Sequence, residues 1–303
     1  MNGLIVLNKP LKMSSHDAVN KVRKILKFKK IGHTGTLDPL ATGILIICVG
    51  DATKLSRYLM TDTKEYRAKI TLGFSTDTYD LEGKIVSELH DFSVTDEDID
   101  STINSFIGKS KQLPPMYSAI KVAGKKLYEY ALKGKEVEVE KRDIEVFSAK
   151  RTSEIIREDG KVTFSVDLNV SKGTYIRSIA NDFGIKIGIP SVLSGLERVE
   201  CSGFTLNDSV SFEDIERGNY QLHSMCNAIG NIYQILDDEE LIKKAKNGMK
   251  ISYRYIRDNY KNTPERIAIV ETINKNKKLV AIYLLDYSET TKTNYYKAET
   301  VWN

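Results

Sequence analysis

Apolar and polar residues alternate in two segments of the chain, and each pattern predicts a strand that is buried on one face. The segments are EYRAKITLGF, residues 65–74, and KVTFSVDLNV, residues 161–170. A third segment, ILIICV at residues 44–49, is apolar throughout and predicts a strand that is buried on both faces. The apolar face of the first segment carries Tyr66, Ala68, Ile70 and Leu72.

Apolar residues at helical spacing predict three helices. The first lies within residues 14–27 and starts at one of two adjacent serines, which are good N-caps. The second starts after Thr95, has acids in its first turn and ends at Gly108. The third lies within residues 171–188, SKGTYIRSIANDFGIKIG.

The order of these segments indicates an α+β protein with a mixed, mainly antiparallel sheet and flanking helices. Near residue 235 a charged helical segment is followed by a predicted hairpin, so we expect a large unit over residues 1–237 and a small β-rich unit over residues 238–303. The small unit contains a predicted hairpin with a polar turn at residues 274–278. An exposed insertion with a short helix is expected within residues 110–142.

Positive charge is concentrated at the start of the chain, although the net charge is only +4. Residues 1–60 hold ten Lys and Arg against three Asp and Glu, whereas the remainder is slightly acidic. A basic surface of this kind suits phosphate contact, but the run KVRKILKFKK on its own is more typical of the solvated face of a helix. The insertion interleaves tyrosines with lysines, which fits either base stacking with phosphate contact or an ordinary surface hairpin.

Several classes of protein are disfavoured. No segment has the apolar length of a membrane span, and the first residues do not form a secretory signal. The three cysteines, Cys48, Cys201 and Cys226, are odd in number and far apart, which predicts reduced thiols in a cytoplasmic protein. We find no metal-ligand spacing, phosphate-binding glycine motif or Ser-His-Asp pattern that competes for the role of active site.

One aspartate stands in an unusual loop within GHTGTLDPLATGILIICVG, residues 32–50. Pro39 favours an extended backbone at Asp38, which argues against a helix cap there. The surrounding glycines permit tight backbone geometry, and the strand that follows gives the loop a rigid support. On its own, however, an aspartate such as Asp38 or a histidine such as His33 in a loop is more often structural than functional.

Two further residues strengthen a functional interpretation when they are taken together. Tyr66 lies on the apolar face at the start of a strand, and Arg177 lies in the first turn of a helix. A helix dipole disfavours a cation at that end unless an anionic partner is near. Each residue also has a structural interpretation, Tyr66 as the edge of a core and Arg177 as a solvated side chain. The acids Asp62, Asp77 and Asp80 are interpreted as turn residues.

Five stretches between residues 8 and 184 resemble, in order, the bacterial tRNA pseudouridine-55 synthases of the TruB-type family. They are NKPLKMSSHDAVNKVRKIL, IGHTGTLDPLATGILIICVGDATKL, KEYRAKITLGFSTDTYDLEG, PPMYSAIKVAGKKLYEYA and SKGTYIRSIANDFG. The resemblance extends to about residue 205, and beyond it only KNGMKI is similar to the family's small C-terminal RNA-binding, PUA-like domain. One small departure is Asn8, where many relatives have Asp.

The resemblance implies specific roles for the residues that match its motifs. Asp38, in the pattern G-H-T-G-x-L-D-P, would be the catalytic nucleophile, and Arg177 in GTYIR would be its partner. Tyr66 in KEYR would stack on the flipped base and act in proton removal at C5. His33 would fill the gap that the base leaves in the RNA. The positions matched to substrate binding are Lys9, Tyr175 and Leu196.

The reaction that the resemblance implies is the isomerisation of uridine 55 in the T-loop of tRNA to pseudouridine. Nothing is added or lost in this reaction, so the resemblance implies no cofactor and no metal ion, in agreement with the absence of their motifs. The T-stem-loop would be the partner, with no obligate protein partner, and residues 1–237 would form the catalytic domain, with the 110–142 insertion gripping RNA. Two alternatives stay open: an RNA-binding protein without activity, and the same chemistry on another RNA. The sequence also leaves open whether Asp38 attacks C1′, attacks C6 or only assists release of the base.

Overall fold

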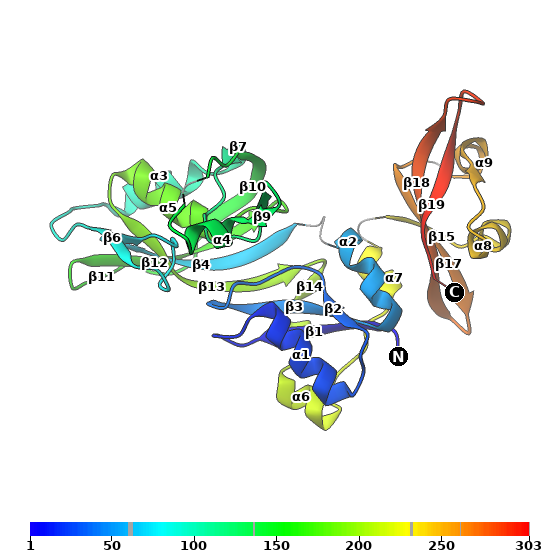
Figure 1. Ribbon diagram of the computed structural model, residues 1–303, viewed down its shortest axis with the longest axis horizontal. Helices are drawn as coiled ribbons and strands as arrows, with labels where there is room; N and C mark the ends of the chain where they lie inside the picture. Colours follow the sequence, from blue (N-terminus) through cyan, green and yellow to red (C-terminus); the bar gives the residue numbers. More distant parts are fainter. Residues whose placement is uncertain (60–62, 136, 231–232, 261, 303) are drawn as a thin grey trace.

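The computed structural model describes residues 1–59, 63–135, 137–230, 233–260 and 262–302. These residues form a large sheet with helices on its faces, followed by a smaller sheet near the C-terminus (Figure 1). The predicted α+β class, with a mixed sheet and a β-rich C-terminal part, is therefore confirmed. No helix among the described residues is long and apolar enough to cross a membrane.

Nine strand pairings are described within the ten-stranded large sheet, and eight of them are antiparallel; the exception is the pairing of β3 with β13. Those two strands are parallel over three residue pairs, from Leu196 opposite Ala41 to Arg198 opposite Gly43. This short parallel contact joins the two halves of the sheet, and we call it the seam. The strands in spatial order are β1 (Gly3–Lys9), β3 (Ala41–Val49), β13 (Ser191–Cys201), β4 (Lys64–Leu72), β12 (Lys161–Val170), β10 (Arg142–Arg151) and β7 (Gly108–Gln112), with β2 (Ile31–His33), β11 (Ile156–Glu158) and β14 (Phe204–Thr205) attached at the sides.

Strand β3 is buried on both faces, as its uninterrupted apolar sequence predicts. On one face, Leu45 and Ile47 pack in the main core together with helix α1 (Ser15–Leu26), whose N-cap is Ser14. On the other face, Ile44, Ile46 and Cys48 belong to a second apolar cluster. Each face of this one strand therefore supports a different part of the molecule.

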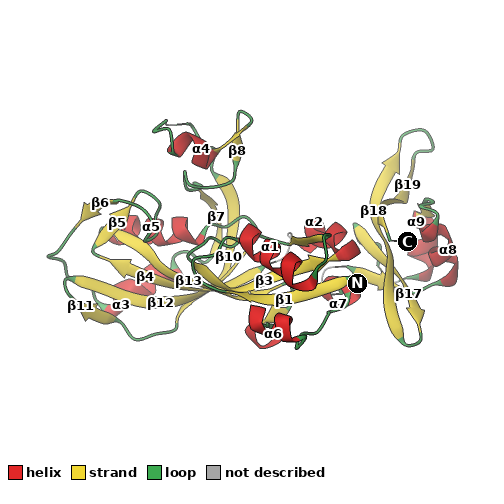
Figure 2. Cartoon of the chain, turned by 60° about the horizontal axis from the view of Figure 1, so that its bottom comes forward, coloured by secondary structure: helices red, strands yellow, loops and turns green. Residues whose placement is uncertain are grey.

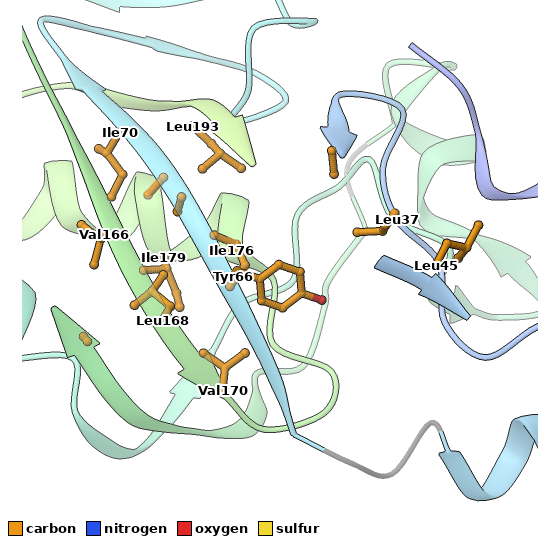
Figure 3. Close-up of a cluster of buried hydrophobic side chains, with 14 of the residues drawn as sticks. Leu37, Leu45, Tyr66, Ile70, Val166, Leu168, Val170, Ile176, Ile179 and Leu193 are labelled. Atoms are coloured by element: carbon orange, nitrogen blue, oxygen red, sulfur yellow. The ribbon is translucent and has the colours of Figure 1, made fainter. Parts of the chain in front are cut away.

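The half of the sheet beyond the seam is covered by helices α3 (Asp96–Asn104) and α5 (Ile176–Ile187). The predicted alternation is confirmed, because the inward residues of β4 and β12 are buried in the main core. Figure 3 shows the Tyr66 ring extending from β4, near Ile176, toward the side that carries Leu37 and Leu45. The second predicted helix is shorter than expected: it ends at Asn104, and Gly108 instead opens β7 with a φ of 108°.

The smaller sheet is flanked by helices α8 (Glu239–Lys246) and α9 (Tyr253–Asn259). The predicted turn at residues 274–278 is too long, because only Asn274 and Lys275 separate the two hairpin strands. Both have positive φ, 49° and 66°, as a tight two-residue hairpin turn requires. The strands in spatial order are β15 (Gln234–Leu236), β17 (Arg266–Ile273), β18 (Asn276–Ser288), β19 (Thr293–Val301) and β16 (Ile251–Ser252).

The smaller sheet shares an apolar cluster with the back of β3, and we call this contact the joint. Ala268, Val270, Leu279, Ile282 and Trp302 pack there against residues of β1, β3 and three short helices. Two of these helices follow β3 directly, η1 (Gly50–Leu55) and α2 (Ser56–Leu59), and the third is α7 (Met225–Ile229). The indole N–H of Trp302 also donates a hydrogen bond to the carbonyl oxygen of Asp51, at 3.0 Å. The C-terminal sheet is thus packed against the large sheet through a common core.

The insertion projects from the body of the molecule beside β7 (Figure 2). It contains a small hairpin, β8 (Lys121–Val122) and β9 (Lys125–Lys126), and the short helix α4 (Leu127–Ala131). The short helix predicted for this region is confirmed. The remaining elements are β5 (Phe74–Thr76), β6 (Ile85–Glu88), η2 (Leu206–Asp208) and α6 (Phe212–Arg217).

Candidate active site

A cavity of about 380 Å³ opens beside the seam and contains most of the residues that the sequence singled out. Its walls come from the loop before β3, the inner end of β4, the insertion, the N-terminus of α5 and the seam part of β13. The predicted site residues on its lining are Asp38, Tyr66, Tyr175, Arg177 and Leu196.

Asp38 is held by the segments on either side of it. The hydroxyl of Ser15, at the start of α1, accepts from the backbone N–H of Leu37 and donates to its carbonyl oxygen, at 2.8 and 3.0 Å. The carbonyl oxygen of Asp38 accepts from the N–H of Ala41, the first residue of β3, at 3.0 Å. The carboxylate itself keeps 39% of its side-chain surface exposed, so it is fixed in place yet accessible.

Arg177 meets Asp38 in the cavity, although the two residues are far apart in the sequence. Its Nε lies 2.9 Å from Oδ2 of Asp38, and its side chain is only 7% exposed. Two of its other N–H groups donate to the carbonyl oxygens of Thr78 and Tyr117, at 3.4 and 3.0 Å. The guanidinium is therefore oriented by backbone on one side and presents its charge to Asp38 on the other.

A second acid, Asp80, also lies against Arg177, and the sequence did not identify it. Its Oδ2 is 3.5 Å from Nη1 of Arg177, and its side chain is 7% exposed. Its Oδ1 accepts from the Thr78 hydroxyl at 2.6 Å and from the N–H of Glu82 at 3.0 Å. The interpretation of Asp80 as a plain turn residue is incomplete, because the turn buries the carboxylate beside the cleft.

The other two acids interpreted as turn residues differ from Asp80. Asp77 is exposed and accepts from the N–H of Lys84 at 2.8 Å, as a turn residue does. Asp62 lies outside the described residues. Of the two acids that the structure describes, Asp80 is thus the one that lies against Arg177.

Two of the predicted residues that line the cavity are tyrosines, Tyr66 in β4 and Tyr175 at the start of α5. Tyr66 is 8% exposed, and burial raises the pKa of its phenol above 10.0, although the charge and hydrogen bond of Arg198 act in the other direction. Tyr175 is the N-cap residue of α5, and burial raises its pKa as well. The Gln112 side chain brackets the Tyr175 backbone, accepting from its N–H at 2.8 Å and donating to its carbonyl oxygen at 3.0 Å.

Lys9 and His33 lie near the cavity but do not line it. Lys9 is fully buried and donates to the carbonyl oxygens of Pro10 and Met13, at 2.9 and 2.7 Å. Burial lowers its pKa to about 8, against the charge of Asp38, which raises it. His33 accepts at Nδ1 from the N–H of Gly35, and burial keeps the pKa of its ring below 6.5. His33 is therefore uncharged at neutral pH.

A second cavity, of about 580 Å³, continues the cleft on the far side of the Asp38–Arg177 pair. Asp38, Arg177 and Leu196 border both cavities. The second has apolar walls from residues such as Leu11 and Leu40, with basic side chains beside them. The cleft is thus longer than the space around a single base.

This arrangement suits chemistry by an ionised carboxylate beside a cation and an aromatic wall. The guanidinium of Arg177 lies 2.9 Å from the carboxylate of Asp38, and the Tyr66 ring offers a face for stacking. Among the described residues, no group of three or more His, Cys, Asp or Glu side chains is arranged to hold a metal ion. The arrangement can attack or stabilise an electron-poor carbon, as carboxylates do in glycosidic-bond chemistry.

Comparison with known proteins places the chain in a family. A model described as "TruB family pseudouridylate synthase (N terminal domain)" matches residues 23–176. A protein of Clostridium tetani named tRNA pseudouridine synthase B is 42% identical over 264 residues, which cover 86% of this chain and 89% of that protein. A protein of the same name from Staphylococcus haemolyticus is 38% identical, covering 100% of this chain and 99% of that protein.

The fold also matches solved structures along nearly the whole chain. A chain of the structure titled "Crystal Structure of a Cbf5-Nop10-Gar1 Complex" aligns with a TM-score of 0.68 at 21% identity, covering 99% of this chain and 84% of that chain. A chain of "Structure of H/ACA RNP bound to a substrate RNA containing 2'-deoxyuridine" gives 0.69 at 20% identity, with 99% and 85% covered. These likenesses show that the chain shares its fold with both structures. The sequence matches go further: the chain belongs to the TruB family of pseudouridylate synthases, and it is an enzyme of the isomerase class.

Proposed function

We propose that this enzyme converts uridine 55 in the T-loop of tRNA to pseudouridine, and that Asp38 carries out the reaction. The observation that carries the proposal is the 2.9 Å ion pair between Asp38 and Arg177 inside a cavity walled by Tyr66. The relatives of similar length support tRNA as the substrate, since they are named tRNA pseudouridine synthase B. The position in the T-loop is our inference from the family resemblance.

The reaction breaks the bond between N1 and C1′, turns the base and rejoins it to C1′ through C5. The Asp38 carboxylate would lie where it can stabilise or attack the sugar or the base, and the Arg177 guanidinium, 2.9 Å away, would hold it in position. Nothing is added to or removed from the nucleoside, so a single carboxylate suffices if the released base stays in the pocket. The walls from the insertion and α5 would retain it there.

The target base is stacked in folded RNA, so it has to leave the stack before it reaches Asp38. Tyr66 would bind the flipped base with its ring, which costs little entropy because the ring is already buried in the sheet. His33 would occupy the gap in the RNA, a role that suits an uncharged ring. Tyr175 and Leu196 would contact the nucleoside, and Lys9 would support the loop that carries Pro10 and Met13.

RNA would be held by basic surfaces outside the cavity. We assign this role to the basic helix α1, to the insertion over residues 110–142 and to a small C-terminal PUA-like domain over residues 238–303. Contacts of this kind weaken as salt rises, because they release counterions from phosphates. We further propose that the enzyme acts on the T-stem-loop in the cytoplasm without an obligate protein partner.

Tritium release from RNA labelled at C5 of uridine tests this function. The wild-type enzyme should release tritium from a T-stem-loop transcript, because pseudouridine formation replaces the hydrogen at C5. A transcript in which uridine 55 is replaced by cytidine, with its other uridines still labelled, should release none. Equal release from both transcripts would refute the assignment to position 55, and tight binding without release from either would indicate an RNA-binding protein.

A further inference from the structure

Arg198 is a buried cation beside the catalytic cleft, and the reaction described above gives it no task. It is 1% exposed and lines the cavity together with Asp38 and Tyr66. Within the described part of the chain it forms no ion pair with an acid, whereas Arg177 pairs with two. Burying a cation without a carboxylate partner is costly, so a fold that keeps one there requires an explanation.

The guanidinium of Arg198 joins three separate parts of the site. Its Nε donates to the carbonyl oxygen of Ile44 in β3 at 2.7 Å, and its Nη2 donates to that of Gly35 at 3.3 Å. Gly35 belongs to the loop that carries Asp38. The third neighbour is Tyr66, which is directly opposite Arg198 across β4 and β13 and lines the same cavity. The Arg198 guanidinium lowers the pKa of the Tyr66 phenol, against the effect of burial.

The backbone at Arg198 is fixed as firmly as its side chain. Gly43 faces it across the seam with a φ of 93°, and a Cβ at Gly43 would lie 2.3 Å from the Arg198 carbonyl oxygen. The two strands can therefore approach this closely only because residue 43 has no side chain. Arg198 thus starts from a rigid point and reaches both walls of the cleft.

We propose that Arg198 is a positioning residue for the isomerisation: its guanidinium fixes the Tyr66 ring relative to the loop that carries Asp38. A flipped uridine is then held between the Tyr66 ring and the Asp38 carboxylate, with a fixed distance between these two groups. Arginine suits this role because its planar group donates in several fixed directions, which a lysine ammonium does not. The inference rests on the proposed function, because it presumes that Asp38 and Tyr66 hold the reacting nucleoside.

Replacement of Arg198 should slow the chemical step and leave RNA affinity almost unchanged. A displacement of about 1 Å between reacting groups costs on the order of 100-fold in rate, so we expect a loss of about 100-fold in single-turnover pseudouridine formation for Arg198→Met and Arg198→Lys. The Kd for the T-stem-loop should stay within about threefold, since the lost interaction acts only in the chemical step. Arg151→Met is the matched control, because Arg151 pairs with Asp100 on the α3 side of the sheet, away from the cavity lining. Wild-type rates for Arg198→Lys would contradict the proposal.

A double-mutant cycle separates positioning through Tyr66 from a general loss of structure. In a Tyr66→Phe background the phenol that Arg198 holds is gone, so Arg198→Met should cost less than about tenfold there. A full loss of about 100-fold in both backgrounds would show that Arg198 acts elsewhere, and would overturn the proposal.

A spectroscopic readout keeps the test independent of activity. With 3-fluorotyrosine at position 66, ¹⁹F NMR follows the titration of that phenol alone. Removing the Arg198 cation should raise the pKa of the phenol, because its charge and hydrogen bond favour the ionised form. An unchanged titration in Arg198→Met would contradict the contact. If wild-type enzyme formed no pseudouridine, the proposed function would fail, while this titration would still decide whether Arg198 positions Tyr66.

Discussion

Two regions of the molecule meet on strand β3, and they differ in residue composition: one is rich in charged side chains and the other is apolar. The cleft at the start of β3 gathers the charged side chains of Asp38, Asp80, Arg177 and Arg198 beside the seam. The joint on the back of β3 is apolar, with Ile44 and Ile46 packed against the C-terminal sheet. The cleft keeps buried charges that a purely structural core avoids, whereas the joint has the composition of an ordinary protein interior.

This difference in composition indicates that the two faces of β3 serve different functions, one in the reaction and the other in the stability of the fold. Because interactions among buried charges are balanced by desolvation, the cleft contributes little net stability; under the proposed function it supplies the electrostatics of the reaction. The joint buries apolar surface and stabilises the fold. Substitutions in the cleft that leave no buried charge without a partner should therefore change rates more than unfolding free energies, and substitutions in the joint should do the reverse.

Apart from loss of Asp38 itself, the largest expected effect comes from Arg177→Met. Asp38 loses the cation that orients it, so the single-turnover rate should fall by about 10³ to 10⁴, the range for loss of a key electrostatic group. Because Asp80 is then left buried without its partner, the unfolding free energy should also fall, by about 3–5 kcal/mol. Rates of pseudouridine formation and urea unfolding measure both effects.

The double variant Arg177→Met/Asp80→Asn checks that explanation. Removing the second charge should restore most of the unfolding free energy and none of the rate. Recovery of the rate would mean that Arg177 is dispensable for the reaction.

Trp302→Ala tests the joint. Trp302 is 3% exposed, so its truncation should lower the unfolding free energy by about 3–5 kcal/mol and leave the rate of the folded enzyme unchanged. Tyr287→Ala is the matched control, because Tyr287 is exposed on the same sheet. A large loss of rate with intact stability would refute the division between cleft and joint. Deleting residues 238–303 is a poorer test, because it would also uncover Ile44 and Ile46.

The sequence predicts strands and helices well where one periodicity dominates. The inward faces of β4 and β12 and both faces of β3 lie where their apolar patterns placed them. The length of the hairpin turn before β18 was overestimated, because polar residues such as Lys277 occur both in turns and on exposed strand faces. Local pattern carries no information on which of these two a polar residue occupies.

The candidate site could be predicted only in part, and for a physical reason. Asp38 and Arg177 belong to long motifs, whereas Asp80 lies in a turn whose sequence is typical of any exposed turn. Its burial depends on packing against α5, a segment about a hundred residues away. One feature of the sequence could have identified Arg198. It lies two positions after Leu196 in β13, and residues two apart in a strand point to the same side, so Arg198 shares a face with a predicted pocket residue.

Asp80→Asn should have a smaller effect than the Arg177 variant. The amide keeps the hydrogen bond from Thr78 but removes the charge beside Arg177, so we expect a fall in rate of about tenfold to 100-fold. Asp77→Asn is the control, because Asp77 is an exposed turn residue three positions away. Single-turnover assays of both variants make the comparison, and equal rates for the two would exclude a role for Asp80.

Lys9 gives an effect of another kind, a dependence of the unfolding free energy on pH. Its pKa is about 8 in the folded state and 10.5 in the unfolded chain. Between these values the unfolded state binds more protons, so the wild type should gain stability relative to Lys9→Met as pH rises from about 8 to 10.5. The slope should approach about 1.4 kcal/mol per pH unit. Urea unfolding across this range measures it, and a flat or falling difference would mean that Lys9 is not buried as a charged group.

Pseudouridine formation by Asp38→Asn tests the central claim most directly. The amide has nearly the shape of the carboxylate but cannot ionise, so the variant should bind the T-stem-loop with wild-type affinity, unfold at the wild-type urea concentration and form no pseudouridine. Product formation within about tenfold of the wild-type rate would contradict the account, because a key catalytic group is worth far more than that.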